Sequence, residues 1–360
     1  MKVLLVITGL GMGGAENQVA NLADAFASRG HKVILASILE PTLVLPRSEQ
    51  VKVVWLGGTK STLGMVNAYA KLAKLIKKSK PDVVHSHMFH ANILSRFARL
   101  VSKVPRLVCT AHSNNEGGKL RMLAYRFTDS LADVFTNVSQ SAVESFERMK
   151  AAPVGRMLIM HNGIDTQRFN FNPIARQQLR AELSIQNSKV FIAIGRFHEA
   201  KDYPNLLSAF SILNSSQPDS HLLIVGDGEL RPKIEQQIKS LDLQAKVSLL
   251  GVRKDVPQLL SAADIFVLSS AWEGFGLVVA EAMATERIAI ATNSGGVAEV
   301  MGGHGFLVAP QDSDALAESM KKASDITEDQ AGEFGKVARQ YIVEKFCLNS
   351  VVDRWLKIYG

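Results

Sequence analysis

The feature that most constrains the fold of this chain is an alternation of short apolar runs and amphipathic segments that continues throughout its length. Apolar runs of this length are typical of buried strands, and the segments between them have the spacing of helices. Strands that alternate with helices imply right-handed crossovers and parallel sheets, in which ligands bind at the carboxyl ends of the strands. The predicted strands span residues 3–8, 32–38, 51–56, 83–85, 106–110, 134–138, 157–160, 189–194, 221–225, 247–249, 265–268 and 288–291.

A stretch rich in turn-forming residues, Met160–Pro173, interrupts this alternation near the middle of the chain. Because 360 residues are enough for two domains, the sequence predicts two doubly wound, Rossmann-like α/β domains with a deep cleft between them. We place these domains at residues 1–165 and 166–340. Residues 341–360 carry apolar side chains at helical spacing and are expected to form a helix that packs back on the first domain.

The charge is divided unevenly between the two halves. Residues 1–170 hold 22 Lys and Arg against 11 Asp and Glu, whereas residues 171–360 hold 19 against 23. The basic clusters comprise Lys71, Lys74, Lys77, Lys78 and Lys80, then Arg96, Arg99, Lys103 and Arg106, then Arg121 and Arg126. Such clusters predict a partner surface, and the absence of basic motifs interleaved with aromatic residues disfavours nucleic acid.

An apolar stripe beside the first lysine cluster favours contact with an anionic membrane surface. The stripe comprises Leu63, Met65, Val66, Tyr69, Leu72, Ala73, Leu75 and Ile76. Packing of these side chains against the domain's own sheet would give the same pattern. We expect vesicle binding through the lysines around residues 71–80 if the membrane interpretation holds.

Two further observations bear on location. No stretch approaches the roughly 18 apolar residues of a membrane span, and the start lacks a signal-peptide cleavage site. The two cysteines, Cys109 and Cys347, are far apart and fit buried thiols in a reducing compartment. We expect a cytoplasmic protein that can also attach peripherally to the inner face of the membrane.

The strongest functional pattern is Ser269–Ala284, SSAWEGFGLVVAEAMA, which follows a predicted strand. Gly276 precedes a helix start at Leu277, where backbone N–H groups can bind an anion such as a diphosphate. Glu281, one turn into that helix, suits a pair of ribose hydroxyls. Glu273, on the loop, suits the hydroxyls of a sugar.

A second pattern, Ile192–Leu207, ends a strand at Gly195 and continues with Arg196 and Lys201. Two fixed cations at the carboxyl end of a strand suit a leaving diphosphate, although pairing of one of them with Glu199 or Asp202 would also explain the pattern. Glycine turns follow the next two strands, at Gly226-Asp227-Gly228 and at Gly251 with Arg253, where a nucleobase could rest against the backbone.

The first domain opens with Gly9, Gly11 and Gly14 in the G-x-G-x-x-G spacing of dinucleotide-binding loops. An NAD-dependent oxidoreductase is therefore an alternative. That interpretation needs an acidic residue about 20 positions further on, at the end of the second strand, where this chain has Ala36-Ser37. It also leaves Glu273 and Glu281 without a role.

Taken in order and at these spacings, the motifs resemble those of retaining GT-B glycosyltransferases of family 4, over nearly the whole chain. The first-domain motifs are Gly13–Glu16, Thr110-Ala111-His112, Asn162-Gly163-Ile164-Asp165 and Phe169. Those of the second domain are Gly195-Arg196 with Lys201, Gly226-Asp227-Gly228, Ala263-Asp264, Glu273-Gly274-Phe275-Gly276 with Glu281, and Ser294-Gly295-Gly296 with Glu299. One departure is Asp202-Tyr203-Pro204, where the family often has Gly after the lysine.

The resemblance implies roles for single residues. Glu281 would bind ribose, Glu273 the transferred sugar, and Arg196 and Lys201 the diphosphate, and His112 would face the anomeric carbon. The expected catalytic residues are therefore Glu273, His112, Arg196 and Lys201. The expected donor-binding residues are Gly14, Gly195, Gly226, Arg253, Phe275, Gly276, Leu277 and Glu281. On the acceptor side we expect His87 and the family signature Glu16.

The resemblance further implies transfer from a nucleotide-sugar, with UDP expected and GDP as the alternative, to a glycan or polyprenyl-linked acceptor of a bacterial surface polysaccharide. We expect no cofactor and no metal. Asp312-Ser313-Asp314 fits a helix N-cap better than a metal site, and His85, His87 and His90 fit structural or acceptor contacts better than ligation. A nucleotide-sugar epimerase with the same fold remains a second alternative.

Overall fold

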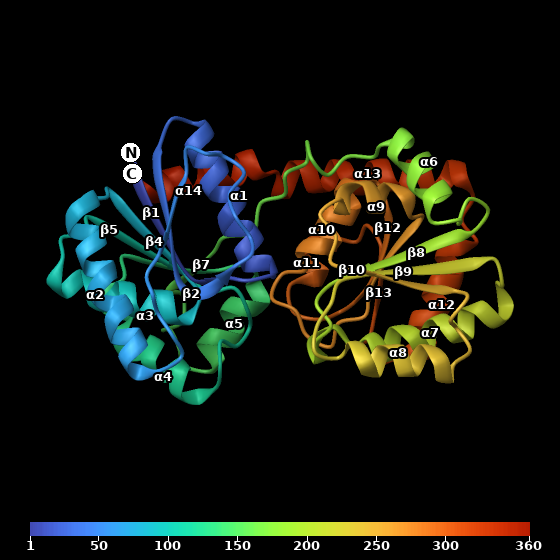
Figure 1. Ribbon diagram of the computed structural model, residues 1–360, viewed down its shortest axis with the longest axis horizontal. Helices are drawn as coiled ribbons and strands as arrows, with labels where there is room; N and C mark the ends of the chain where they lie inside the picture. Colours follow the sequence, from blue (N-terminus) through green and yellow to red (C-terminus); the bar gives the residue numbers. More distant parts are fainter. The chain divides into compact units, whose positions relative to one another are not determined.

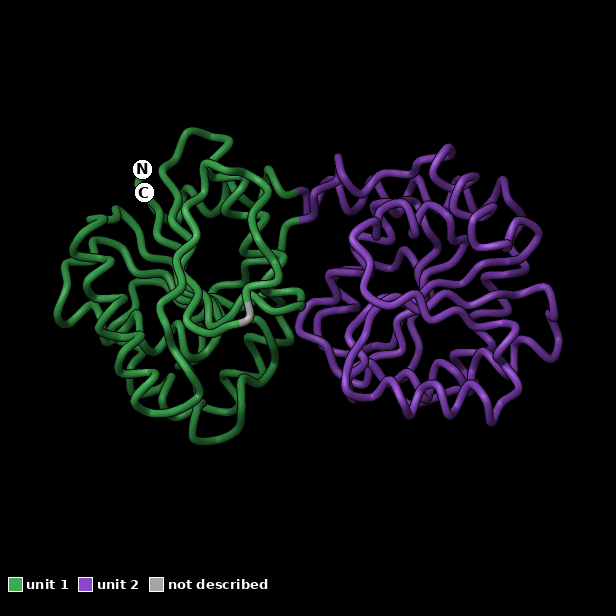
Figure 2. The backbone as a smooth tube through the Cα atoms, in the orientation of Figure 1, with its two compact units in different colours: residues 1–163, 348–360 green, residues 164–347 purple. Residues whose placement is uncertain are grey.

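A computed structural model describes residues 1–40 and 42–360, which fold into two compact units (Figures 1 and 2). Unit 1 comprises Met1–Gly163 and Leu348–Gly360, and unit 2 comprises Ile164–Cys347. Each unit contains a single parallel sheet covered by helices on both faces, so the predicted α/β class with two Rossmann-like units is confirmed.

The seven strands of unit 1 are ordered β3-β2-β1-β4-β5-β6-β7. They are β1 (Lys2–Leu10), β2 (Lys32–Thr42), β3 (Lys52–Trp55), β4 (Val83–His87), β5 (Arg106–Thr110), β6 (Val134–Asn137) and β7 (Met157–Ile159). The helices are α1 (Gly14–Ser28), α2 (Thr62–Ser79), α3 (Phe89–Val101), α4 (Lys119–Thr128), α5 (Gln140–Arg148) and α14 (Leu348–Tyr359).

Alternate residues of the central strand β1 face two different cores. Val3, Leu5 and Ile7 pack under α1 and α14, whereas Leu4 and Val6 pack under α2, α3, α4 and α5. These positions are almost fully buried, because a strand covered by helices on both faces has no solvent side. This explains the continuous apolar run at the start of the chain.

The six strands of unit 2 are ordered β10-β9-β8-β11-β12-β13. They are β8 (Lys189–Ile194), β9 (Ser220–Val225), β10 (Val247–Gly251), β11 (Ile265–Leu268), β12 (Ile288–Thr292) and β13 (Phe306–Val308). The helices are α6 (Pro173–Glu182), α7 (Tyr203–Ser216), α8 (Arg231–Ser240), α9 (Val256–Ala262), α10 (Leu277–Ala284), α11 (Val297–Met301), α12 (Ser313–Ser324) and α13 (Glu328–Phe346). The sequence pattern did not predict β13, whose three residues are too few to show a period.

The boundaries between the units lie after Gly163 and after Cys347, instead of after residues 165 and 340. Residues 341–346 belong to α13, which is part of unit 2. Cys347 then adopts an extended backbone, with φ −54° and ψ 131°, and pairs as a single parallel bridge with Ile164. The helix that packs on unit 1 is therefore α14 alone, and it contacts α1 through the core that contains Val352 and Trp355.

Candidate active site

The carboxyl edge of the unit 2 sheet holds an ion pair between two predicted catalytic residues. Lys201 ends the 3-10 turn that follows β8, and Glu273 lies in the loop that follows β11. Lys201 Nζ lies 2.5 Å from Glu273 Oε1, and Ser270 Oγ donates to the same oxygen at 2.8 Å. Both charged side chains are mostly buried, so the carboxylate is held in one orientation at the end of the strands.

Backbone contacts fix the two loops that carry this pair. Ala271 N donates to Ala200 O at 2.9 Å, and Ser269 Oγ donates to Lys201 O at 2.8 Å. The Lys201 turn and the Glu273 loop are thereby joined independently of the ion pair. Lys201 and Glu273, which the resemblance assigns to the diphosphate and to the transferred sugar, thus lie beside each other at this edge.

Arg196 follows the end of β8 and is exposed, and it forms no hydrogen bond or ion pair with any part of the chain that the structure describes. Its guanidinium is available to an anionic ligand. The alternative in which one of these cations pairs with Glu199 or Asp202 is therefore wrong among the described residues, because Lys201 pairs with Glu273 and Arg196 with neither.

Close backbone approach explains the glycines at this edge. A Cβ added to Gly226, which has φ +142°, would lie 2.0 Å from Gly195 O, and one added to Gly228 would lie 2.5 Å from Phe197 O. A Cβ added to Gly195 would lie 3.0 Å from Lys201 Cε. Gly195 and Gly226 thus keep β8 and β9 close at their carboxyl ends and leave room for the lysine.

The helix α10 begins at Leu277 after Gly276, whose φ of +88° requires glycine. No side chain among the described residues caps this helix start. Its first backbone N–H groups therefore point into the space beyond the strands, where they can bind an anion. Phe275 is buried and packs edge-on against Phe346, with ring centroids 5.6 Å apart, so its role here is to anchor the loop.

Glu281 lies one turn into α10, and its carboxyl group has an unusually high pKa. Burial raises the pKa of its carboxyl to about 8, and the charge of Arg168 partly opposes this shift. A carboxyl that has no hydrogen bond within the described residues can accept two hydroxyl hydrogens from a vicinal diol. Arg253, after β10, forms two hydrogen bonds to Asp255, at 2.8 and 2.6 Å, so its guanidinium is oriented but already paired.

The departure from the family pattern at Asp202 has a direct explanation. Asp202 adopts the left-handed conformation, with φ 45° and ψ 50°, that glycine would adopt there, and its side chain caps α7 at Asn205 N. The next residue, Tyr203, donates its hydroxyl to Gly195 O at 2.8 Å. The loop is therefore altered in residue type while the lysine keeps its place.

At the carboxyl edge of the unit 1 sheet, His87 ends β4 and His112 follows β5. His87 Nδ1 lies 3.0 Å from His112 Nε2, and burial lowers the pKa of both rings, that of His112 to about 4. His87 Nε2 and His112 Nδ1 are buried and have no partner among the described residues. In either tautomer of two neutral rings, one of these free nitrogens is a donor and the other an acceptor, so each can form one further hydrogen bond.

Neighbouring groups support this histidine pair. His85 lies beside His87, with ring centroids 3.9 Å apart, and hydrogen-bonds Tyr359 at 2.6 Å and Thr110 at 2.7 Å. The structural interpretation of His85 is thereby supported. Within the described residues, no group of three or more His, Cys, Asp or Glu is arranged to hold a metal ion.

Glu116 is a site residue that the sequence analysis missed. It accepts a 3.0 Å hydrogen bond from His112 N and a very short one from the Tyr125 hydroxyl. Burial raises the pKa of its carboxyl to about 7. Glu116 lies four residues after His112 in the same loop, and the irregular backbone there gives no period that would single it out.

The glycine loop of unit 1 leads into α1, whose first residue is Gly14. Glu16 folds back toward the loop, because a Cβ on Gly13 would lie 2.5 Å from Glu16 Oε2. Gly14 itself is exposed at the helix start. Glu16 therefore packs against its own loop, and the sequence-based assignment of Glu16 to the acceptor side stays a prediction.

The stripe of apolar residues on α2 belongs mostly to the core of unit 1. Leu72, Ala73 and Ile76 are buried, and Met65, Tyr69 and Leu75 are packed against them; Leu63 and Val66 are exposed. The membrane interpretation of this stripe is thus wrong for most of its residues, because they pack on the domain's own sheet. The lysines beside them are exposed.

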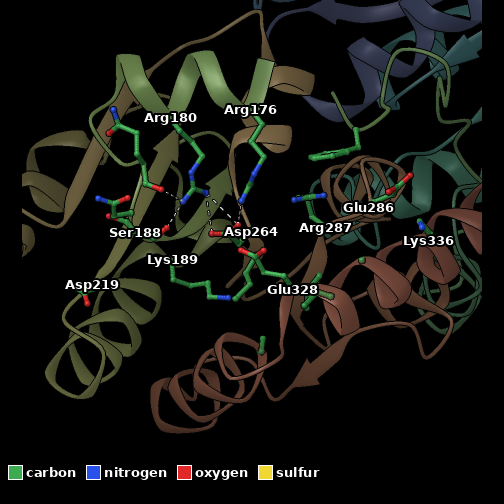
Figure 3. Close-up of a pocket in the computed structure, with 18 residues that line it drawn as sticks. Arg176, Arg180, Ser188, Lys189, Asp219, Asp264, Glu286, Arg287, Glu328 and Lys336 are labelled. Carbon is green, nitrogen blue, oxygen red and sulfur yellow. Dashed lines mark hydrogen bonds and ion pairs between the residues drawn. The ribbon is translucent and has the colours of Figure 1, made fainter. Parts of the chain in front are cut away.

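A pocket of about 780 Å³ lies at the opposite edge of unit 2, near the amino ends of β8, β11 and β12 (Figure 3). Arg176, Arg180 and Arg287 converge there on Asp264 and on the last carbonyls of α9. The guanidinium groups thereby satisfy the orphan carbonyls at the helix end. This pocket lies where α6, the end of α9 and the start of β11 meet, and none of the predicted site residues lines it. Likewise, Asp312 is the N-cap of α12, as predicted, and accepts from Ala315 N at 2.9 Å.

Comparisons with known proteins agree with this arrangement. The model of Glycosyltransferase Family 4 matches residues 12–168, and that of Glycosyl transferases group 1 matches residues 175–341. A UDP-Gal:α-D-GlcNAc-diphosphoundecaprenol α-1,3-galactosyltransferase of Escherichia coli is 29% identical over 80% of this chain and 77% of its own. A Campylobacter jejuni α-1,4-N-acetyl-D-galactosaminyltransferase whose substrate name ends in diNAcBac-PP-undecaprenol is 27% identical over 99% of this chain and 98% of its own.

Among solved structures, Anabaena Alr3699/HepE in complex with UDP has a TM-score of 0.84 at 22% identity, covering 99% of both chains. The fold and the charged edge of unit 2 therefore define a GT-B glycosyltransferase. The chain belongs to the glycosyltransferases that combine a family 4 domain with a group 1 domain. These matches favour neither the oxidoreductase nor the epimerase.

Proposed function

We propose that this protein transfers a sugar, with retention of configuration, from a UDP-sugar to a polyprenyl-diphosphate-linked glycan of a bacterial surface polysaccharide. The observation that carries the donor half of the proposal is the Lys201–Glu273 pair beside the unpaired Arg196 and the uncapped start of α10. The acceptor half is supported by the two undecaprenol-linked substrates in the names of the relatives.

The donor roles follow from charge and geometry in unit 2. Arg196, Lys201 and the first N–H groups of α10 would neutralise the diphosphate, whose negative charge grows as the bond to the anomeric carbon breaks. Glu281 would accept hydrogen bonds from the ribose hydroxyls. Glu273 Oε1 is occupied by Lys201 and Ser270, so Oε2 is the oxygen left to accept from sugar hydroxyls.

The proposed transfer takes place on one face of the sugar. The acceptor oxygen bonds to the anomeric carbon as the carbon–phosphate oxygen bond breaks, and the acceptor proton passes to the departing diphosphate. This route needs no protein base, which fits the pKa of about 4 that burial gives the His112 ring, because a base with so low a pKa accepts a proton weakly. In unit 1, the free nitrogen of His87 or of His112 would bind an acceptor hydroxyl. Arg196 and Lys201 supply the positive charge, so we propose that turnover needs no metal.

The test begins with a thermal-shift scan of UDP- and GDP-sugars, because a ligand that binds only the folded state raises the melting temperature. The stabilising donor is then incubated with polyprenyl-diphosphate glycans, and the anomeric configuration of the product is read by NMR. Retention is expected, with equal rates in EDTA. An inverted product refutes the retaining mechanism, and loss of turnover in EDTA that Mg²⁺ restores refutes metal independence.

Substitutions of Glu273 and Lys201 test the roles proposed for these two residues. Glu273→Gln and Lys201→Ala are each expected to lower kcat by about 10²–10³-fold, as for other preorganised electrostatic groups. Each leaves a mostly buried charge without its partner, so the melting temperature should also fall, and circular dichroism at the assay temperature checks that the variants remain folded. Asp242→Asn, an exposed carboxyl outside the site, is the control. Interconversion of the nucleotide-sugar without an acceptor would instead indicate an epimerase.

A further inference from the structure

Three neighbouring helices of unit 1, α2, α3 and α4, contain no acidic residue. They lie together on one face of the sheet, and α3 packs against both of the others (Figure 1). Their nine basic residues are Lys71, Lys74, Lys77, Lys78, Arg96, Arg99, Lys119, Arg121 and Arg126. Arg96 is buried and Arg99 pairs with Asp133, so the other seven set the charge of this surface.

The outer sides of α3 and α4 also expose large apolar side chains. On α4, Leu120 is 83% exposed and Phe127 81%, with Leu123 between them. Met122 and Tyr125, on the opposite side of the same helix, are buried in the core. The exposed apolar stripe on α4 is thus separate from the buried side of the helix that packs in the core.

A second apolar stripe lies on the neighbouring helix. Phe97, Leu100 and Val101 have the i, i+3, i+4 spacing of one helix side, and Leu100 is 64% exposed. We define the amphipathic face as these three residues with Leu120, Leu123, Phe127 and the exposed lysines and arginines of α2 and α4. Exposed apolar residues gathered in this way mark an interaction site.

We infer that the amphipathic face docks on a membrane surface that contains anionic lipid. The charge decides the occupant: lysine is depleted where protein surfaces bind each other, whereas this face carries several lysines and no carboxylate on its three helices, as attraction to anionic headgroups requires. Leu, Val and Phe side chains can enter the boundary between headgroups and acyl chains, while Lys and Arg remain at the phosphates. The inference deepens the proposed function, because a polyprenyl-linked acceptor lies in a membrane.

The surface differs from the one that the sequence indicated. The apolar stripe of α2 is largely core, so the apolar contact is provided by α3 and α4, and the lysines of α2 contribute charge alone. A polybasic segment and apolar side chains together give the two signals that stable peripheral binding needs.

The test measures sedimentation of the full chain with vesicles of equal parts phosphatidylglycerol and phosphatidylcholine. Leu120→Gln/Phe127→Gln is expected to weaken binding by about tenfold or more, because two inserted side chains are lost. Both side chains are exposed, so the fold should not depend on them. Val154→Gln/Ile174→Gln, which removes two exposed apolar side chains elsewhere, is the matched control and should bind like the unchanged protein.

The charge is tested separately. Lys119→Gln/Arg126→Gln is expected to weaken binding to the same vesicles by about tenfold, and pure phosphatidylcholine vesicles should bind poorly. Circular dichroism of each variant checks its fold, and Leu100→Gln repeats the apolar test on α3.

Undiminished binding by the Leu120/Phe127 variant, or no binding by the unchanged chain, overturns the inference. So does sedimentation equilibrium showing a dimer that this variant dissociates, because the amphipathic face would then be a subunit interface. Vesicle binding is measured without donor or turnover. Its failure is therefore separate from a failure of the proposed transfer, which a detergent-solubilised acceptor tests.

Discussion

Glu273 Oε1 accepts hydrogen bonds from both Lys201 and Ser270, so the hydroxyl of Ser270 helps the ammonium to hold the carboxylate. Ser270 is completely buried, and its own carbonyl accepts from Thr292 Oγ1. This places Ser270 as a positioning residue: it acts on the reaction through Glu273.

Ser270→Ala is therefore expected to lower kcat by about tenfold, the effect of losing one hydrogen bond to a charged group, with a smaller change in KM. Ser270→Thr keeps a hydroxyl and should recover part of the rate. Steady-state kinetics measure both variants, and Ser240→Ala, in an exposed helix turn, is the control. A kcat for Ser270→Ala equal to that of the control would remove Ser270 from the site.

Glu281 gives the site a pH dependence. With a pKa of about 8, its carboxyl is mostly protonated and neutral at pH 7, whereas ribose hydroxyls bind best to the ionised form. UDP affinity should thus rise with pH below about 8, by up to about tenfold per unit, and level off above it.

Calorimetry of UDP binding across this pH range measures the effect. Glu281→Gln cannot ionise, so its profile reports only the titration of UDP and of other groups. Identical profiles for the unchanged protein and Glu281→Gln would exclude Glu281 from ribose binding.

At the scale of elements, the residue that caps the start of α7, Asp202, has a left-handed backbone as well as a capping side chain. Asp202 has φ 45°, which costs a non-glycine residue about 1 kcal/mol, and it caps the helix at Asn205 N. Asp202→Gly removes the cap and relieves the backbone, so stability should stay within about 0.5 kcal/mol. Asp202→Ala removes the cap and keeps the strain.

Asp202→Ala is expected to lose about 1–2 kcal/mol of unfolding free energy, measured by urea denaturation. If Asp202→Gly were the less stable of the two, backbone strain would not explain the glycine that related sequences often have there.

A helix or strand could be predicted from the sequence where its apolar residues followed a single spacing. Apolar runs located the strands, because both sheets are buried on both faces, and the three residues of β13 fell below that signal. On α2 one apolar stripe had two possible uses, and only the observed packing against the core decides between them. The second stripe of α4 was hidden because a helix with apolar residues on two sides has no single polar face.

The site was predictable in part for a similar reason. Lys201 and Glu273 lie at the ends of neighbouring parallel strands, a position that the chain order already implies. Glu116 and Ser270 act through hydrogen bonds within their own loops, to His112 and Glu273, and the irregular backbone of a loop gives such pairs no period from which to predict them.

At the scale of the whole molecule, unit 1 is built from two separate parts of the chain. Val351, Val352, Trp355 and Tyr359 of α14 share a buried core with α1, β1 and β2, and Tyr359 holds His85. Deleting residues 348–360 should therefore expose this core and destabilise unit 1, while unit 2 remains intact.

Limited proteolysis with peptide mapping measures this difference: cleavage should become rapid within residues 1–163 and stay slow within residues 164–347. Deletion of Gly360 alone is the control. Equal protection of both units in the truncated chain would show that α14 is dispensable for unit 1.

The divided construction of unit 1 also sets an order of events during synthesis. Domains fold as units as the chain is made, and the N-terminal one commonly folds first. Here unit 2 has all its residues once Cys347 is made, whereas unit 1 must wait for residues 348–360 to cover the apolar face of α1 and β1. The unit translated first is thus the last to be completed, and its core stays uncovered until residues 348–360 are in place.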